Sequence, residues 1–292
     1  MIPPQQNRSI IARPRISDQL KCANQYSVTT VCAAAGYGKT TLLSAFWDSF
    51  AEEDGICAWL TLDEADGDPS FLIRNIIAAC ANAGVRIGSL EEVAATSLGA
   101  QVRALLSALM LRLHEAEQLI ILIIDDYHIG QNPDTDALLR VILQHAPTNF
   151  HLIISSREQP NIEQEKLRSL GQLLELGPKE LSFSLSDIRD YFESAISEPE
   201  AAELLKVTEG WPIAIQLVHL HCEQSDASNL LDMLRSIRSD HLGSYLLEQV
   251  FSKQDPEMQN FLLETAQFGN IDCDVINEVC ERSDCWPKFE YL

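Results

Sequence analysis

Residues 33–41 contain the most recognisable chemistry of this chain. They read Ala33, Ala34, Ala35, Gly36, Tyr37, Gly38, Lys39, Thr40 and Thr41. This pattern matches the phosphate-binding loop, with alanine at the position of its first glycine. The two glycines have no Cβ atom, so the chain can turn through positive φ and place successive N–H groups around phosphate oxygens. The loop therefore predicts a bound nucleoside triphosphate.

Three side chains of the loop have expected roles. Lys39 would reach the β- and γ-phosphates, the Thr40 hydroxyl would ligate Mg²⁺, and Thr41 could bond a more distal phosphate. A β-branched run at 26–32 precedes the loop, and a helical pattern begins near Lys39. The positive end of that helix dipole, about half an elementary charge, adds to the attraction for phosphate.

An acidic pair closes the longest wholly apolar run of the chain, residues 119–124. A Mg²⁺ ion between the β- and γ-phosphates needs a carboxylate at a strand end that faces the loop. We therefore assign Asp125 to the metal, and Asp126 to orienting or activating the attacking water. An aspartate reaches less far than a glutamate, so we expect slow hydrolysis. The alternative is that both acids only end a strand in a turn.

Other polar residues also follow predicted strands. Arg157 comes after the strand at 150–156, where its guanidinium would sense the γ-phosphate or the charge developing on it. A solvated loop arginine is the alternative. Asp63 and Glu64 end the strand at 56–62 and are weaker candidates for a general base. His128 is interpreted as structural and has no assigned role in the chemistry.

The order of the predicted elements indicates the fold class. Strands are expected at 26–32, 56–62, 119–126, 150–156 and 172–176, with helices between them. This alternation predicts an α/β fold with a doubly wound parallel sheet and a ligand at the carboxyl ends of its strands. Helices alone are expected beyond about residue 181, at 187–196, 200–209, 212–222, 242–251 and 256–266. We thus predict a P-loop NTPase domain at 1–180 and a smaller helical domain at 181–292.

Composition argues against several classes of partner. The net charge is −22, the pI is about 4.6, and no basic patch offsets them, so binding of nucleic acid or acidic membranes by this segment is not expected. The eight cysteines include no C-x-x-C pair, which argues against structural zinc. The first residues lack the pattern of a secretory signal, and the apolar runs are too short to cross a bilayer. We expect a cytoplasmic protein.

Five motifs in this order and spacing carry a family resemblance: residues 13–16, 35–42, 59–64, 125–128 and 209–212. Together they resemble the MalT-like large ATP-binding LuxR-type transcriptional regulators, which are STAND-class signal-transduction NTPases. The resemblance implies an ADP-bound resting form and an ATP-bound form that self-associates. It also implies that the helical domain leads into a winged-helix-like region.

The resemblance also implies roles for single residues. Ala33 to Thr40 would form the phosphate loop, Asp125 with Asp126 the magnesium and water site, and Arg157 a sensor-like arginine. Pro212 would lie near the adenine, and Arg13 with Pro14 would cover the base from the other side. Ala33 is an accepted variant in the family, whereas Ala34 replaces its usual proline.

The chain ends at Leu292, before the superhelical inducer-sensing region and the helix-turn-helix of such regulators. DNA contact is therefore expected only through a C-terminal domain absent from this chain. We predict a regulatory switch module that binds ATP or ADP with Mg²⁺. The alternatives are a truncated nucleotide-binding fragment that does not signal by itself, and a P-loop small-molecule kinase.

Overall fold

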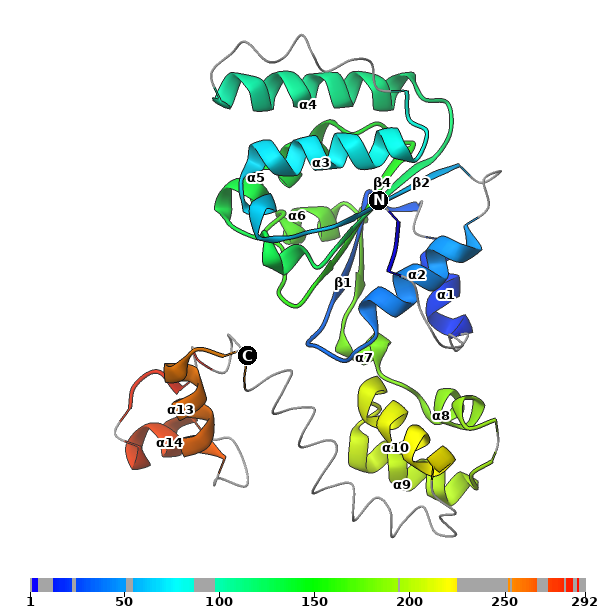
Figure 1. Ribbon diagram of the computed structural model, residues 1–292, viewed down its shortest axis with the longest axis vertical. Coiled ribbons are helices and arrows are strands. Elements are labelled where there is room, and N and C mark those ends of the chain that lie inside the picture. Colours follow the sequence, from blue (N-terminus) through cyan, green and yellow to red (C-terminus); the bar gives the residue numbers. More distant parts are fainter. Residues whose placement is uncertain are drawn as a thin grey trace. The chain divides into compact units, whose positions relative to one another are not determined.

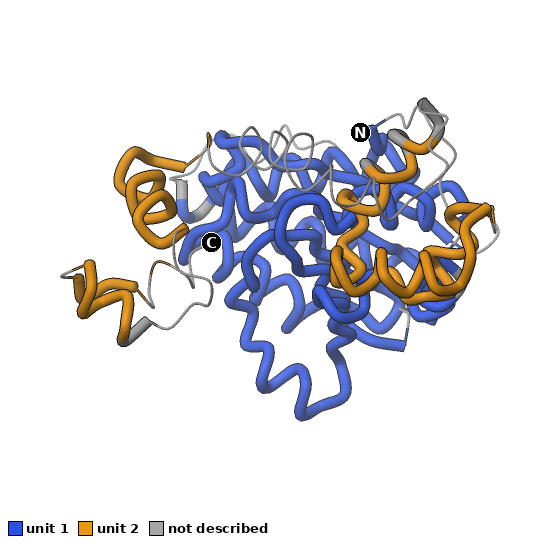
Figure 2. Tube along the Cα trace, turned by 90° about the horizontal axis from the view of Figure 1, so that it is seen from below, with its two compact units in different colours: residues 1–182 blue, residues 183–292 orange. Residues whose placement is uncertain are grey.

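The computed structural model describes residues 2–4, 13–22, 25–50, 55–86, 98–193, 195–224, 252, 254–266, 273–280, 282–285 and 288. The chain divides into two compact units, Met1–Ser182 and Phe183–Leu292 (Figure 2). The helix predicted at 242–251 lies outside the described residues. Among the described helices, none is both long enough and apolar enough to span a bilayer.

The first unit alternates strands and helices, as the sequence predicts. Its elements are α1 (Pro14–Lys21), β1 (Val28–Cys32), α2 (Lys39–Ser49), β2 (Ile56–Thr61), the 3-10 turn η3 (Glu64–Gly67), α3 (Pro69–Asn82), α4 (Leu98–Glu115), β3 (Ile120–Asp125), the 3-10 turn η5 (Tyr127–Ile129), α5 (Pro133–His145), β4 (Phe150–Ser156), α6 (Gln164–Ser169), β5 (Leu173–Leu176) and α7 (Pro178–Leu181).

The five strands form one parallel sheet in the order β2-β3-β4-β1-β5. The strand that follows α5 is therefore inserted between β1 and β3, where Ile154 pairs with Thr30 on one side and with Ile124 on the other. Strands β1, β3 and β4 are buried along their whole length, and burial on both faces explains the uninterrupted apolar run of β3.

Each face of the sheet has its own hydrophobic core. Helices α3, α4, α5 and α6 lie on one side and α1 and α2 on the other (Figure 1). Alternate residues of β3 serve the two cores: Leu122 and Ile124 face the larger one, and Ile121 and Ile123 the smaller. This arrangement confirms the predicted α/β fold with a doubly wound sheet.

Helix α1 was missed by the sequence prediction, which assigned no element to its residues. Ile16 and Leu20 are buried in the smaller core. Two arginines at the start of the helix hold carbonyl groups far along the chain: Arg13 Nη2 donates to Ser182 O (2.9 Å) and Arg15 Nη2 to Glu180 O (2.7 Å). The first helix is therefore tied to the end of the first unit.

The described part of the second unit consists of helices and their connections. These helices are α8 (Leu185–Tyr191), α9 (Glu198–Thr208), α10 (Pro212–Gln224), α13 (Pro256–Thr265) and α14 (Cys273–Val279). The rings of Tyr191 and Phe192 contact His219 on α10. Farther along the chain, Phe261 on α13 and Ile276 on α14 are buried in a common cluster.

Candidate functional site

The carboxyl edge of the parallel sheet brings together most of the residues that the sequence singled out. The loop 33–38 leaves β1, Asp125 ends β3, and Arg157 directly follows β4. Because β4 lies between β1 and β3, and neighbouring strands are about 4.8 Å apart, the loop strand and the Asp125 strand are separated by about 10 Å. The ends of three adjacent strands thus form the floor of the site.

Two glycines give the loop its path. Gly36 has φ 80° and Gly38 has φ 73°, both in the left-handed region. Gly38 is the N-cap of α2, and its carbonyl accepts from Leu42 N at 2.9 Å. A Cβ atom on Gly38 would meet no atom within 4 Å, so the requirement for glycine there is conformational and not one of space. The helix therefore begins at Lys39, with its N-terminus at the loop.

Lys39 folds back onto its own loop. It is only 8% exposed, and its Nζ donates to Ala33 O (2.6 Å) and Ala34 O (3.1 Å). Burial lowers the pKa of Lys39, and the nearby Asp126 carboxylate opposes that change. The N–H of Ala33 donates to Ser156 O (3.3 Å), so Ala33 contributes to the loop mainly through the carbonyl that receives Lys39.

Asp125 is a buried carboxylate, 1% exposed. Neither of its side-chain oxygens completes a hydrogen bond of normal geometry with any described residue. Burial raises the pKa of Asp125, while the Ser155 and Thr40 hydroxyls are close enough to lower it in part. An unsatisfied carboxylate beside a threonine hydroxyl suits a hard divalent cation, because it supplies the oxygen ligands that Mg²⁺ prefers.

The structure describes no group of three or more His, Cys, Asp or Glu side chains that could hold a metal ion by themselves. An ion at Asp125 would therefore need oxygen ligands from other sources. Mg²⁺ is commonly bound in this way, by one or two protein ligands together with phosphate oxygens and water. The donor set of Asp125 and Thr40 fits such a metal–nucleotide complex.

Asp126 differs in conformation from the neighbouring acid. Its backbone is left-handed, with φ 56° and ψ 39°, and it is the N-cap of η5. Asp126 and Arg157 both influence the pKa of Lys39, the first raising it and the second lowering it. The three charged side chains therefore lie near enough to interact electrostatically.

His128 belongs to the same cluster, although the sequence prediction left it out. Its Nδ1 lies 3.9 Å from Asp126 Oδ1. Burial lowers the pKa of His128, and the nearby Arg157 lowers it further. The Asp126 carboxylate acts in the opposite direction and raises that pKa. The sequence signal that could have found His128 is its position two residues after Asp126.

Several predicted residues have other local roles or lie elsewhere. Asp63 is the N-cap of η3, and its side chain accepts a hydrogen bond from Ala65 N at 2.8 Å. Its side chain therefore has a structural role. Thr41 is exposed and Tyr37 half-buried. Arg13 binds Ser182 O. Pro212 is the first residue of α10 in the second unit, so its proximity to a nucleotide stays a prediction.

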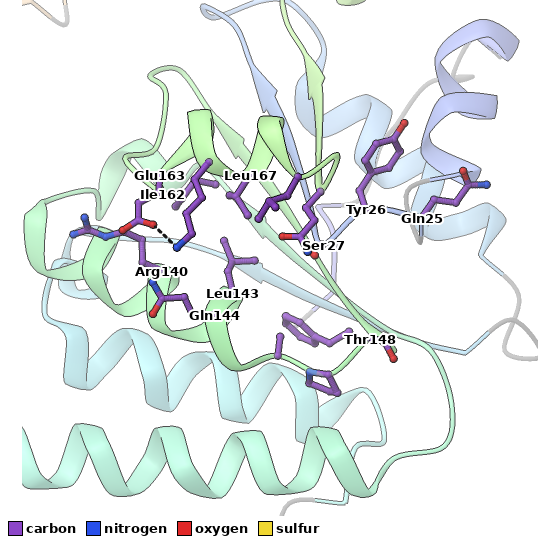
Figure 3. Close-up of a pocket in the computed structure, with 16 residues that line it drawn as sticks. Gln25, Tyr26, Ser27, Arg140, Leu143, Gln144, Thr148, Ile162, Glu163 and Leu167 are labelled. Atoms are coloured by element: carbon purple, nitrogen blue, oxygen red, sulfur yellow. Dashed lines mark hydrogen bonds and ion pairs between the residues drawn. The ribbon is translucent and has the colours of Figure 1, made fainter.

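A separate cavity of about 570 Å³ lies on the first unit, lined by residues 25–27 just before β1, the end of α5 and helix α6 (Figure 3). Arg140 and Gln144 line it from α5, and the Lys166–Glu163 ion pair (3.1 Å) from α6. These residues come from the amino edge of the sheet and the adjoining helices, and the phosphate loop contributes none. The cavity is therefore not the candidate nucleotide site.

Comparison with a solved structure supports the fold described above. A Walker-type ATPase of Pyrococcus abyssi matches with a TM-score of 0.55, covering 96% of this chain and 86% of that chain at 16% sequence identity. At this identity the match concerns the fold alone, and that fold agrees with the five-stranded parallel sheet and its phosphate loop. The chain has the fold of a P-loop ATPase with a helical part.

Sequence comparison identifies the relatives more narrowly. Residues 247–292 match the family of the MalT winged helix domain. The HTH-type transcriptional regulator MalT of Klebsiella pneumoniae is 31% identical over 289 residues, which cover 97% of this chain. The chain is MalT-like, as its five motifs predict. It spans about a third (32%) of the length of that relative.

Proposed function

We propose that this chain binds ATP or ADP with Mg²⁺ at the carboxyl edge of its sheet and serves as the nucleotide-dependent switch of a MalT-type transcriptional regulator. One observation carries the proposal: the buried carboxylate of Asp125, which completes no hydrogen bond of normal geometry with a described residue, lies two strands from a phosphate loop whose lysine donates to two loop carbonyls. A metal–nucleotide complex would satisfy both groups together.

Each residue of the site has a role in this proposal. Lys39 exchanges the carbonyls of Ala33 and Ala34 for phosphate oxygens, and the remaining loop N–H groups cradle the phosphates. Thr40 and Asp125 hold Mg²⁺, which would neutralise charge on the phosphates. Asp126 orients the attacking water, and Arg157 stabilises charge that develops on the γ-phosphate. Arg13 and Pro212 are proposed to contact the adenine.

A switch requires the two nucleotides to favour different states of the protein. Nucleotide binding that is equally tight in both states would shift nothing. We propose that the ATP form self-associates and that slow hydrolysis returns it to the ADP form. DNA contact would belong to a further domain, as the HTH-type designation of the MalT relative suggests, and the site of action would be the cytoplasm.

The first test compares melting and size distribution with ADP and with a non-hydrolysable ATP analogue, each with Mg²⁺. At one hundred times the dissociation constant, binding stabilises a protein by about 2.7 kcal/mol, which gives a measurable melting shift. Light scattering should then report larger particles with the ATP analogue. The absence of any melting shift would contradict the nucleotide site. Identical sizes despite tight binding would leave only a nucleotide-binding fragment, and transfer of phosphate to a metabolite would favour a kinase.

A further inference from the structure

Tyr127, between Asp126 and His128, connects the candidate site to helix α5. The side chain is fully buried, at 0% exposure. Its hydroxyl donates to Asp136 Oδ1 at 2.9 Å and lies 3.4 Å from Thr135 Oγ1. Both acceptors are in the first turn of α5, and both are buried. Burial also raises the pKa of Tyr127, so the hydroxyl keeps its proton and remains a donor.

The turn that follows Asp126 is fixed from several directions. Asp126 O accepts from Ile129 N at 3.0 Å, and Tyr127 O accepts from Gly130 N at 3.1 Å. A Cβ atom on Gly130 would come within 3.1 Å of the Asp66 backbone, which shows how closely η5 approaches η3. Two side chains link this turn to α5: the Tyr127 hydroxyl donates to Asp136, and Thr135 Oγ1 donates to Gly130 O at 3.0 Å.

The hydrogen bond from Tyr127 to α5 matters because the preceding residue is Asp126, whose backbone is left-handed. A left-handed backbone is less favourable for aspartate than for glycine, although aspartate adopts it more readily than bulkier residues, and it persists where the surroundings hold it. We propose that Tyr127 is a positioning residue, which holds Asp126 in its left-handed conformation, near Lys39 and Arg157, by anchoring the next residue on Asp136. This inference rests on the proposed nucleotide function. It adds a residue that acts on the hydrolysis step through Asp126 and does not itself contact the nucleotide.

The test compares Tyr127→Phe with a matched control at the other end of the same sheet. Thr29→Val also removes one buried hydroxyl, which interacts with His151 Nε2 at 3.0 Å. Both variants should lose similar stability, because each leaves one buried polar group without its partner. The kcat for ATP hydrolysis should fall about tenfold in Tyr127→Phe alone, with KM and the dissociation constant of ATP within twofold of wild type.

Substitutions of Asp136 provide a second, independent readout. Asp136→Asn keeps an acceptor oxygen and should retain near-wild-type hydrolysis, whereas Asp136→Ala should lose as much as Tyr127→Phe. The double variant Tyr127→Phe/Asp136→Ala should lose no more than either single variant, because both remove the same contact. Should Tyr127→Phe fail to fold, the two Asp136 variants carry the comparison.

The outcomes separate this proposal from the proposed function. Wild-type hydrolysis in Tyr127→Phe, an equal loss in Thr29→Val, or additive losses in the double variant would each overturn the role of Tyr127 while leaving nucleotide binding in place. Failure of the wild-type chain to bind ATP would instead overturn the proposed function, and the role of Tyr127 with it. A parallel melting measurement with ATP distinguishes these two cases.

Discussion

At the amino edge of the sheet, buried His151 has a partner for each ring nitrogen, whereas at the carboxyl edge buried Asp125 completes no hydrogen bond of normal geometry with a described residue. His151 Nδ1 lies 2.7 Å from Tyr26 O, and Nε2 lies 3.0 Å from Thr29 Oγ1. Neither Asp125 oxygen completes a hydrogen bond among the residues described. Both side chains come from strands of one sheet, and both are 1% exposed.

The two side chains are equally buried, so they differ only in whether their polar atoms have hydrogen-bond partners. A buried polar group with all its partners needs no ligand, and His151 is explained by the fold alone. A buried carboxylate without partners costs stability and persists where something else completes it. The left-handed Asp126 and the buried cation of Lys39 lie at that same edge. Buried polar groups that lack partners, and unfavourable backbone conformations, therefore identify the site better than burial alone does.

The largest expected effect comes from removing the cation of the carboxyl edge. Lys39→Ala should lower ATP affinity about a thousandfold, or ~4 kcal/mol, because the phosphates lose their direct positive partner. Loss of the ATP-induced melting shift measures it. Lys166→Ala is the matched control, since that exposed lysine pairs with Glu163 at the separate cavity. Unchanged ATP affinity in Lys39→Ala would contradict the assignment of residues 33–41 as a phosphate-binding loop.

The next largest expected effect is the pH dependence of the free energy of unfolding, which tests His151 at the amino edge. Burial lowers the pKa of His151 to about 4, whereas the unfolded value is about 6.5. Below pH 6.5 the unfolded chain binds a proton that the folded chain refuses, so the free energy of unfolding should decrease between pH 6.5 and 4. The contribution is roughly 3 kcal/mol. Urea unfolding of wild type and His151→Gln across this range measures it, and parallel pH profiles would contradict the assignment.

The smallest expected effect is a change in the free energy of unfolding. It has opposite signs in the Asp→Asn variants of two buried aspartates. Burial raises the pKa of Asp125, so its charge costs stability above the folded-state pKa and that cost disappears as the pH falls. Asp125→Asn should therefore raise the free energy of unfolding without ligand by about 1 kcal/mol at pH 8, while abolishing the Mg²⁺ dependence of ATP binding.

Asp66 is the matched control for that change. It is 2% exposed, and its two oxygens accept from Asp63 N (2.9 Å) and Asn75 Nδ2 (2.7 Å). Asp66→Asn should lower the free energy of unfolding, because an amide NH₂ replaces an accepting oxygen. Chemical denaturation without nucleotide measures both variants. A loss of stability in both would show that Asp125 has partners after all.

Local sequence was enough to predict much of the fold and the centre of the site. Strands such as β3 and β4 are buried on both faces, so their composition alone reveals them. Gly36, Gly38 and Lys39 act through spacing within one loop, which a sequence records directly. The predicted strands at 26–32 and 119–126 extend slightly beyond β1 and β3, because strand ends depend on pairing more than on residue type.

Long-range pairing determined what the sequence could not predict. The insertion of β4 between β1 and β3 depends on contacts such as Ile154 with Thr30 and Ile124. Asp125 and Asp126 are the same residue type, yet Asp125 ends a buried strand and Asp126 has a left-handed backbone. Helix α1 owes its position partly to the bond from Arg13 to Ser182, 169 residues away.

Cys32, the last residue of β1, directly precedes the phosphate loop. Burial raises the pKa of its thiol to about 12, and the nearby Lys39 only partly offsets this. Because the thiolate is the reactive form, Cys32 should react slowly with oxidants and alkylating reagents at neutral pH. Cys22, at the end of α1, is exposed. A thiol-directed label can therefore be placed on that helix while the nucleotide loop stays chemically intact, and oxidative conditions should leave its phosphate cradle unmodified.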